Sequence, residues 1–316
     1  MTFALFAYNQ ERFIREAVEG ALAQDYSPLE IILSDDCSVD STFSIMNDLA
    51  MAYKGPHTVI LNRNSANQGL GRHINSVMTI ANGEFIVVAA GDDVSMCCRS
   101  RLLCDKWLKT EKKADLLCSN YIAMSENGAS QHTGCGCKPE QMNPVAMARY
   151  GYGVTGATAA WTSRLWDRFG DLPNDAIHED QLLPFRAILM GGIDVVNEPL
   201  VRYRMGTSTW IERGKANAKE MRRRTVILAK NALSVARTQA VDAERLDRPD
   251  LKKMIQKREK EYSLILAIHE GKNIALIDII FELLTGIEYK SVIRAYVQYN
   301  FPSLHGFILW CRNGTV

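Results

Sequence analysis

Short apolar runs alternate with segments of helical period between residues 2 and 120, and no other feature constrains the fold of this chain as strongly. The runs are "TFALFA", "LEIILS", "TVILN" and "EFIVVAA", whose length and aliphatic content indicate buried strands. Strands that alternate with amphipathic helices build βα units. We therefore expect an α/β domain with a mainly parallel sheet that is flanked by helices.

Two of the intervening segments have their apolar residues on one helical face. In the segment after the first strand, this face consists of Phe13, Ile14, Ala17, Val18, Ala21 and Leu22. In "GLGRHINSVMTIA" it consists of Leu70, Ile74, Val77, Met78 and Ala81. We expect both helices to pack on the sheet through these faces.

Polar residues follow three of the predicted strands, and ligands of open α/β sheets bind where the carboxyl ends of the strands meet. The three groups are Ala7-Tyr8-Asn9, Ser34-Asp35-Asp36 and Gly91-Asp92-Asp93. Two adjacent carboxylates repel each other, which favours a cation at the third group. An aromatic ring, a carboxylate that accepts from an N–H group and a metal-binding carboxylate suit a nucleotide diphosphate with a divalent ion.

Composition limits the domain count and the partners. The chain has 316 residues, of which 47% are hydrophobic, enough for one large α/β domain with an appendage or for two domains. Lys and Arg total 37 against 36 for Asp and Glu, so no overall charge attracts nucleic acid. We therefore expect no nucleic-acid partner.

Three observations bear on the cellular compartment. The cysteines include a vicinal pair and a Cys-Gly-Cys, neither with the spacing of a zinc knuckle, and we expect reduced thiols. The start "MTFALFAYN" lacks the basic leader of a signal peptide. The apolar stretches "NIALIDIIFELL" and "GFILW" are shorter than the roughly 18 residues of a membrane span. The sequence therefore predicts a cytoplasmic protein.

The second half of the chain has less regular patterns. Residues 124–153 are rich in Gly, Asn and Ser and predict long loops over the sheet. From about Thr209 the period is helical, with "DAERLDRPD" as the expected linker. An apolar stripe, formed by Ile277, Ile280, Phe281 and Leu284, is expected to pack on the α/β domain or on a second copy of the chain. The alternative is an interfacial helix on a membrane surface.

Six blocks of the sequence resemble the family 2 glycosyltransferases in order and spacing over about residues 2 to 210. They are "FAYNQERFIREAVEGALAQDY", "LEIILSDDCSVDST", "NQGLGRHIN", "GEFIVVAAGDD", "HEDQLLPFRA" and "EPLVRYR". The resemblance implies a GT-A (Rossmann-like) fold, a nucleotide-diphosphate-sugar donor and transfer with inversion at the anomeric carbon. It implies a catalytic domain over residues 1–210, followed by a C-terminal helical region over residues 211–316.

The resemblance also implies roles for individual residues. Asp180 matches the catalytic base, and Asp92 matches the acid that ligates Mg²⁺ or Mn²⁺ on the diphosphate. The positions implied to bind the nucleotide are Ala7, Tyr8, Asp36 and Asp93. The positions implied to support the site are Glu179, Arg186 and Arg204.

Three departures from the family pattern are visible. Ala90 replaces the first acid of the Asp-X-Asp motif. Residues 73–75 read His-Ile-Asn where the family often has Ala-Arg-Asn, with Arg72 offset by one position. Residues 205–206 read Met-Gly where a histidine often follows the Tyr-Arg pair. These departures affect the metal site and the phosphate clamp.

The same residue types also suit purely structural roles. Asp35, Asp36 and Asp40 are suited to cap the helix after the second strand, and we expect Asp40 to cap and Asp36 to bind. Glu179 and Asp180 are suited to the first turn of a helix, where the dipole favours acids. Tyr203 and Arg204 are suited simply to finish a strand.

The sequence thus predicts a metal-dependent inverting glycosyltransferase that uses a UDP- or dTDP-linked sugar. The expected acceptor is a hydroxyl of a glycan or lipid-linked glycan in bacterial surface polysaccharide synthesis. The alternative is a nucleotide-sugar-binding module without turnover, which Ala90 would suit. An NAD-type site is disfavoured because "AYNQERF" has no glycine in the first strand-to-helix turn. A homo-oligomer and peripheral contact with the inner face of the plasma membrane are left open.

Overall fold

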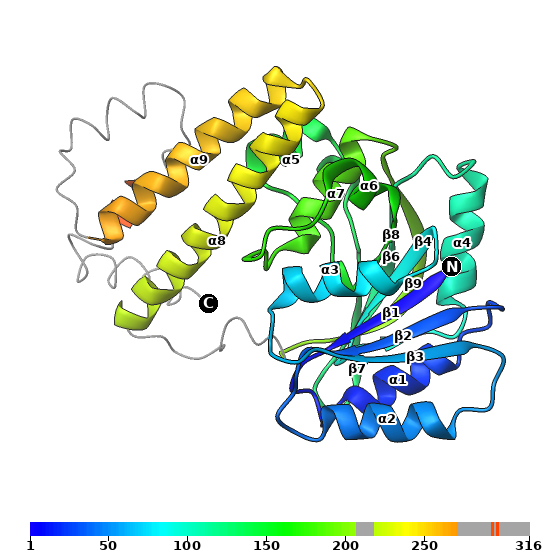
Figure 1. The fold of residues 1–316 in the computed structure, drawn as a ribbon. Helices are drawn as coiled ribbons and strands as arrows, with labels where there is room; N and C mark the ends of the chain where they lie inside the picture. The colour runs from blue at the N-terminus through cyan, green and yellow to red at the C-terminus, as the bar shows by residue number, and fades with distance from the viewer. Residues whose placement is uncertain (207–217, 271–291, 294, 297–316) are drawn as a thin grey trace. The chain divides into compact units, whose positions relative to one another are not determined.

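The computed structural model describes residues 1–206, 218–270, 292–293 and 295–296 (Figure 1). The chain divides into two compact units. The first unit comprises Met1–Met147 and continues from Tyr152 to the end of the last strand, and the second contains two long helices. The predicted boundary between residues 210 and 211 as a division between functional domains stays a prediction.

The four apolar runs form the first four strands, as predicted. They are β1 (Thr2–Ala7), β2 (Glu30–Asp35), β3 (Thr58–Arg63) and β4 (Phe85–Ala90). β1 pairs in parallel with both β2 and β4, and β2 pairs in parallel with β3. β1 is buried along its whole length, as expected of a strand with helices on both faces.

The rest of the sheet is mixed. Its strands are β5 (Val94–Ser95), β6 (Leu116–Met124), β7 (Ser130–Gly134), β8 (Ala159–Thr162) and β9 (Ile193–Arg204). In the described residues the order is β3-β2-β1-β4-β8-β6-β9-β5, with β7 paired to β6. β8 is antiparallel to both β4 and β6, and β9 is parallel to β6. The carboxyl ends of β1, β2, β4, β6 and β9 therefore meet at one edge of the sheet.

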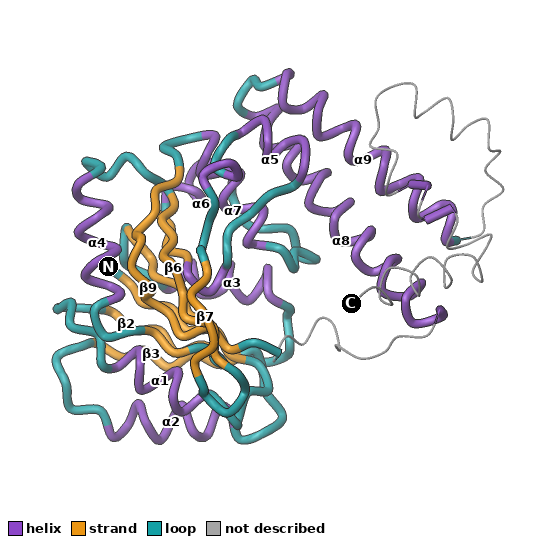
Figure 2. The backbone as a smooth tube through the Cα atoms, turned by 180° about the vertical axis from the view of Figure 1, so that it is seen from behind, coloured by secondary structure: helices purple, strands orange, loops and turns teal. Residues whose placement is uncertain are grey.

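Helices cover both faces of the sheet. α1 (Ile14–Leu22) and α2 (Thr42–Ala52) lie side by side on one face, and α3 (Leu70–Ile80) lies on the other (Figures 1 and 2). The next helices along the chain are α4 (Arg99–Lys109), α5 (Pro144–Tyr150), α6 (Arg164–Phe169) and α7 (Glu179–Leu189), with short 3₁₀ turns at Pro139–Gln141 and Gly156–Thr158.

The predicted inner face of α1 is largely confirmed, although Phe13 and Leu22 are half-buried, and that of α3 is partly confirmed. Ile14, Ala17, Val18 and Ala21 are buried in α1. Leu70 and Met78 of α3, and Ala81 just after it, are only half-buried, whereas His73 and Asn75 are buried. Both polar side chains have partners, because His73 Nε2 lies 2.6 Å from Ser34 Oγ and Asn75 Nδ2 donates to the carbonyl of Leu172. Apolar period alone does not predict a buried polar residue whose partners are distant in sequence.

The expected long loops at residues 124–153 contain regular structure that the sequence analysis did not predict. β7 is exposed along nearly its whole length, so it has no alternation of apolar residues. α5 begins at Pro144, and the Asn143 side chain accepts from the backbone N–H of Val145 at 2.8 Å. An Asn before a Pro at the first helical position is a helix-start signal that could have indicated α5.

The second unit contains α8 (Ala218–Arg245) and α9 (Pro249–His269), which confirms a helical period after Thr209. The expected linker "DAERLDRPD" is wrong in extent, since α8 continues to Arg245 and only residues 246–248 lie between the helices. The stripe at Ile277, Ile280, Phe281 and Leu284 lies outside the described residues. Within the part of the chain that the structure describes, we find no helix with the length and apolar character of a membrane span.

Candidate active site

The ends of β1 and β2 are held together by hydrogen bonds between their loops. The backbone N–H of Asn9 donates to Ser38 Oγ at 2.8 Å, and the N–H of Asp36 donates to the carbonyl of Ala7 at 2.9 Å. Asn9 and Cys37 have positive φ angles of 52° and 62°, a conformation that non-glycine residues adopt at some cost. The two loops thus form one rigid edge.

Ala7 and Tyr8 lie on this edge in different environments. Ala7 is 3% exposed, whereas the Tyr8 side chain is 39% exposed and available to stack on a planar ligand. The predicted nucleotide contacts of these two residues stay predictions.

Asp36 organises the chain that leads into α3. Its Oδ1 accepts from the Asn64 side chain at 2.7 Å and from the N–H of Gln68 at 2.9 Å, and its Oδ2 accepts from the N–H of Gly69 at 3.0 Å. A carboxylate has about four acceptor positions, so these three donors leave one on Oδ2. The residue is 3% exposed. Asp36 therefore has a structural role, with room for one further N–H donor.

The N-cap of α2 is Ser41, so Asp40 supports the start of the helix from one residue earlier than expected. Its Oδ1 accepts from the N–H of Thr42, the first residue of α2, at 3.0 Å, and its Oδ2 accepts from the N–H of Glu11 at 3.1 Å. Burial opposes ionisation of this carboxyl, but these hydrogen bonds lower its pKa overall.

The loop after β4 approaches the β1 loop closely because residue 91 is glycine. A Cβ atom at Gly91 would lie 2.3 Å from Gln10 Oε1 and 3.1 Å from both Ala7 Cβ and Ile14 Cδ1. The N–H of Gly91 donates to the carbonyl of Phe6 at 2.9 Å. Asp92 is therefore presented beside the edge formed by the first two loops.

Arg204, at the end of β9, fixes the backbone around Asp92 and Asp93. Its N–H donates to Asp93 Oδ1 at 2.7 Å, and its Nε donates to the carbonyl of Asp92 at 2.9 Å. Its guanidinium also donates to the carbonyl of Glu126 at 2.6 Å and to Glu16 Oε2 at 3.0 Å, and it lies 4.5 Å over the ring of Phe13. The Arg204 side chain is 1% exposed, so it supports the loop from within the protein.

Asp93 is the buried member of the aspartate pair. Burial raises its pKa well above the usual range, and the charge of Asp92 adds to this rise. The Arg204 N–H and the charges of Arg99 and Arg204 lower the pKa, but they do not cancel this rise.

Arg99 is fully buried on α4, where it donates to Ser95 Oγ at 2.8 Å and to the carbonyl of Ala157 at 2.8 Å. Burial lowers its pKa to about 9, and the charge of Asp93 opposes this shift. Sequence analysis missed Arg99, since nothing in "CCRSR" distinguishes it from a surface arginine.

Asp92 and Asp93 supply oxygen ligands of the kind that Mg²⁺ and Mn²⁺ prefer. In the described ranges no cluster of three or more His, Cys, Asp or Glu side chains forms a metal cage. One or two carboxylates fit a nucleotide-bound ion whose other ligands are phosphate oxygens and water. The donor set therefore fits the expected ion.

Asp180 lies in the first turn of α7 without capping it. Its Oδ1 is buried and has no hydrogen-bond partner among the described residues, although His178 Nδ1 lies 3.7 Å away. The Asp180 side chain as a whole is 36% exposed. The carboxylate thus combines a partly exposed side chain with an oxygen that accepts no hydrogen bond from the described residues.

Glu179, the preceding residue, has a strongly perturbed carboxyl. Burial raises its pKa to about 8, and the charge of Asp180 adds to this effect. A Cβ atom at Gly156 would lie 2.7 Å from Glu179 Oε1, so this glycine makes room for the carboxyl.

The chain between β7 and β8 is tied to the start of α7. The N–H of Val154 donates to the Asp180 carbonyl at 2.9 Å, and the N–H of Thr155 donates to the Gly136 carbonyl at 2.7 Å. A Cβ atom at Gly153 would lie 2.0 Å from the Asp180 carbonyl oxygen, so only glycine fits there. These contacts fix the position of Asp180.

Three further residues that the sequence singled out have contacts within the protein itself. Arg186 is 2% exposed and donates to the carbonyl of Gly170 at 3.0 Å. Arg72 is exposed and donates to the carbonyl of Gln68 at 2.9 Å, beside the loop that Asp36 holds. Ala90 is half-buried at the end of β4 and pairs with Phe6 of β1.

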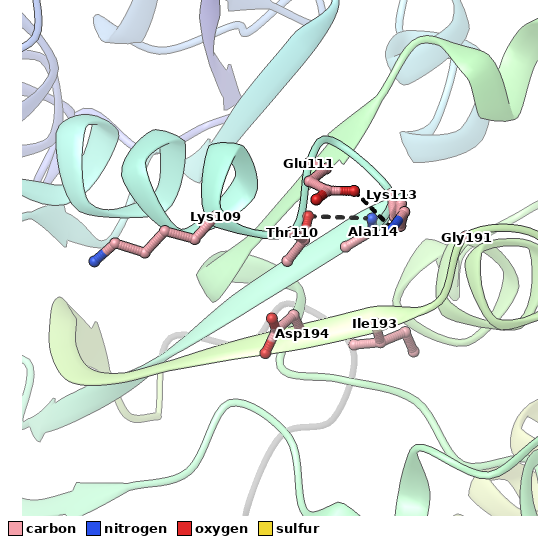
Figure 3. Close-up of a pocket in the computed structure, with 8 residues that line it drawn as sticks. All are labelled: Lys109, Thr110, Glu111, Lys113, Ala114, Gly191, Ile193 and Asp194. Atoms are coloured by element: carbon pink, nitrogen blue, oxygen red, sulfur yellow. Dashed lines mark hydrogen bonds and ion pairs between the residues drawn. The ribbon is translucent and has the colours of Figure 1, made fainter.

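A surface pocket of about 370 Å³ lies at the opposite edge of the sheet (Figure 3). Its lining residues come from the end of α4, the turn after it and the start of β9, and include Lys109, Lys113 and Asp194. Because β6 and β9 begin here, the pocket is separated by the length of the sheet from the carboxyl ends that hold Asp92. It contributes nothing to the candidate active site.

Comparisons with known proteins bear on the family and the fold of the chain. Residues 2–134 match the family described as glycosyl transferase family 2. WfaP of Escherichia coli, named as a UDP-Glc:alpha-D-GlcNAc-diphosphoundecaprenol beta-1,3-glucosyltransferase, is 28% identical over 204 residues, covering 64% of this chain and 74% of WfaP. Matches to mycobacterial relatives at 36% identity extend over 94 residues and span 27% of those proteins.

Two solved structures share the fold. Staphylococcus aureus TarS in complex with UDP-GlcNAc has a TM-score of 0.55 at 17% identity, covering 94% of this chain and 90% of TarS. The mannosyltransferase PcManGT from Pyrobaculum calidifontis, in complex with GDP-Man and Mn²⁺, has a TM-score of 0.52 at 18% identity, covering 98% of this chain and 84% of PcManGT. The mixed α/β architecture is therefore that of the GT-A glycosyltransferases.

Proposed function

Because residues 2–134 belong to glycosyl transferase family 2, we propose that the whole chain is a glycosyltransferase that moves a sugar from a nucleotide diphosphate to a hydroxyl acceptor with inversion. The observation that carries this proposal is Asp180, whose Oδ1 is buried without a hydrogen-bond partner in the described part of the chain. Unpaired buried carboxylate oxygens are costly, and they persist where a ligand completes the site.

In the proposed mechanism, Asp180 is the general base. A sugar hydroxyl is a poor nucleophile at neutral pH, so a carboxylate about 3 Å away takes its proton as the oxygen attacks the anomeric carbon. The new glycosidic bond forms on the face opposite to the nucleotide diphosphate, which leaves with the electron pair of the broken bond. The contacts from Val154 and Gly153 keep the Asp180 backbone in place during this step.

The nucleotide diphosphate is proposed to lie along the ends of β1, β2 and β4. Tyr8 stacks on the base, and the remaining acceptor position of Asp36 Oδ2 takes the base N–H, which favours uracil or thymine. Asp92, with Asp93 behind it, would hold Mn²⁺ or Mg²⁺ on the diphosphate. When bound, such an ion stabilises the charge that develops on the leaving group.

The identities of donor and acceptor are proposed from the relatives. TarS was solved with UDP-GlcNAc, and the name of WfaP describes transfer of glucose from UDP-Glc to a lipid-linked sugar. We propose a UDP- or dTDP-linked donor and a glycan or lipid-linked glycan acceptor in bacterial surface polysaccharide synthesis. The seven described cysteines carry free thiols, which suits the proposed cytoplasmic location.

A panel of UDP-, dTDP-, GDP- and CDP-sugars tests this function. Each is added with and without Mn²⁺, and both thermal stabilisation and release of free nucleotide are measured. A glycosyltransferase is thermally stabilised by one class of donor and releases free nucleotide from it. Thermal stabilisation by a nucleotide sugar without release of free nucleotide, whichever acceptor is supplied, would identify the alternative, a binding module without turnover. No stabilisation by any nucleotide sugar would overturn both.

The metal assignment has its own variant. Asp92→Asn should abolish the gain in UDP affinity that Mn²⁺ provides, with little change in melting temperature, because a partly exposed loop acid contributes little packing. Asp105→Asn, at an exposed acid on α4, is the matched control. Equal UDP binding by the unmodified protein with and without Mn²⁺ would contradict the assignment.

A further inference from the structure

Tyr121 on β6 and Tyr203 on β9 form an aromatic pair that the proposed mechanism does not use. Their ring centroids are 5.2 Å apart and their planes are inclined by 57°. Both side chains are half-buried. Tyrosines with one apolar face and one polar tip are well suited to bind a ligand that has both characters.

The face on which this pair lies follows from the strand geometry. Successive side chains of a strand point to opposite faces of the sheet. Arg204 extends toward Phe13 and Glu16, on the side of α1. Tyr203 therefore lies on the opposite face. Tyr121 pairs in register with Val201, two residues before Tyr203, so both rings share that face.

The surroundings of Tyr121 are adapted to its ring. β7 pairs Gly134 with Tyr121, and a Cβ atom at Gly134 would lie 2.2 Å from Tyr121 Cζ. Gly134 has no positive φ angle, so its backbone would accept alanine. The glycine is therefore explained by the space that the ring occupies.

Tyr203 lies within electrostatic reach of both parts of the candidate active site. Burial raises its pKa to about 12, and the charges of Asp93, Asp92 and Asp180 all add to this rise. Its backbone position is fixed relative to the aspartate pair, because the adjacent Arg204 N–H donates to Asp93 Oδ1 at 2.7 Å. The phenol thus remains a hydrogen-bond donor near the carboxylates.

We propose that Tyr121 and Tyr203 form the platform that receives the acceptor sugar, an inference that rests on the proposed function. A pyranose ring presents C–H groups on its faces and hydroxyls at its rim. The aromatic faces cover the C–H groups, and the Tyr203 hydroxyl donates to a rim oxygen while another hydroxyl meets Asp180. Because the strand order separates β6 and β9 from β1 and β2, the platform lies away from the nucleotide side of the site.

The experiment compares acceptor and donor parameters for the same variants, with UDP-glucose, UDP-GlcNAc and Mn²⁺ as probes and a panel of p-nitrophenyl monosaccharides as acceptors. Tyr121→Ala and Tyr203→Ala should raise the acceptor KM by about tenfold, the value of one aromatic contact. UDP affinity and acceptor-independent donor hydrolysis should change by less than about twofold. Tyr203→Phe, which keeps the ring, should change the acceptor KM by less than Tyr203→Ala.

Two further variants separate the platform from general packing. Gly134→Ala displaces the Tyr121 ring without removing it and should raise the acceptor KM, whereas Ser130→Ala on the same strand should not. Tyr53→Ala removes a half-buried tyrosine that stacks on His57 before β3, at the other edge of the sheet, and should leave acceptor KM unchanged.

The outcomes distinguish failure of the platform proposal from failure of the proposed function. A protein that binds no UDP overturns the proposed function. If UDP binds, saturation-transfer NMR with the same acceptor panel reports on the platform without requiring turnover. Saturation transfer that is lost in both alanine variants supports it. No transfer to any acceptor in the unmodified protein, or equal changes in donor and acceptor KM in the alanine variants, overturns it.

Discussion

Arg204 Nη2 donates to Glu16 Oε2 at 3.0 Å, although 188 residues separate the two in sequence. This contact joins the last strand of the sheet to the first helix, directly behind the loop of Asp92 and Asp93. Since Glu16 is about half-exposed, the ion pair itself contributes little, whereas the Arg204 bonds to the Asp92 and Glu126 carbonyls are buried. These contacts therefore indicate that Arg204 supports the shape of the site more than it contacts substrate.

Replacing Arg204 should accordingly destabilise the protein. Arg204→Met removes the hydrogen bonds that the guanidinium donates to the carbonyls of Asp92 and Glu126, and we expect a loss of about 2 kcal/mol or more in the free energy of unfolding. This corresponds to about 4–8 °C in melting temperature, measurable by calorimetry. Arg12→Met is the control, because Arg12 also pairs with Glu126 but is 67% exposed. Equal, small shifts for both variants would remove the structural role of Arg204.

Asp180→Asn separates catalysis from helix stability. Asparagine cannot take the acceptor proton, so kcat should fall by roughly 10² to 10⁴, while donor KM and melting temperature change little. Asp167→Asn, a first-turn acid of α6, is the control and should retain full activity. The measurement is kcat beside melting temperature with an identified donor and acceptor. A variant that melts lower but still transfers sugar at the normal rate would show that Asp180 is only a first-turn acid.

Asp36→Asn should affect both stability and base preference. The carboxylate accepts from three N–H groups, and an asparagine amide group would face at least one of them with a donor of its own. We expect a loss of about 1–3 kcal/mol in the free energy of unfolding. UDP should also lose its advantage over CDP, as measured by calorimetric titration. Unmodified protein that binds CDP as tightly as UDP would count against the base contact, and Asp48→Asn on α2 serves as the exposed control.

Glu179 gives a prediction for how the stability of the folded protein depends on pH. Its pKa is about 8 in the folded protein against a usual value of 4.5. At pH values between these two, the folded state therefore holds a proton that the unfolded chain has released. Stability from this group is complete below about pH 4.5 and is lost as pH rises through 8. Melting curves of Glu179→Gln and the unmodified protein should therefore diverge with rising pH, with the variant relatively more stable at pH 8.5 than at pH 5. A constant difference across this range would show that Glu179 ionises normally.

The elements that the sequence predicted correctly are those with local signals. β1 to β4 and α1 have uninterrupted apolar patterns. The roles of Asp36, Asp92 and Asp180, which were inferred from the sequence blocks around them, stay predictions. α3 was harder to predict because His73 and Asn75 are buried by partners far along the chain. β7 has no apolar alternation because nearly all of its side chains are exposed.

The missed features of the site depend on distant pairing. Arg99 becomes significant only because α4 places it behind Asp93, and Tyr203 only because β9 pairs with β6 in one particular register. Neither relationship has a local signature, since each joins segments that tertiary structure alone brings together. Sequence patterns can therefore predict the carboxylates of the site more readily than the residues that surround them.

The insertion of β8 between β4 and β6 has a consequence for how the protein is made. When residues 1–134, which include β4 and β6, have emerged from the ribosome, the strand that separates these two in the sheet has not yet emerged. The nascent chain therefore exposes two unpaired strand edges until residues 159–204 emerge. Because β9 also carries Arg204, the Asp92 loop reaches its final conformation only near the end of translation of this unit, and pairings of such high contact order form slowly.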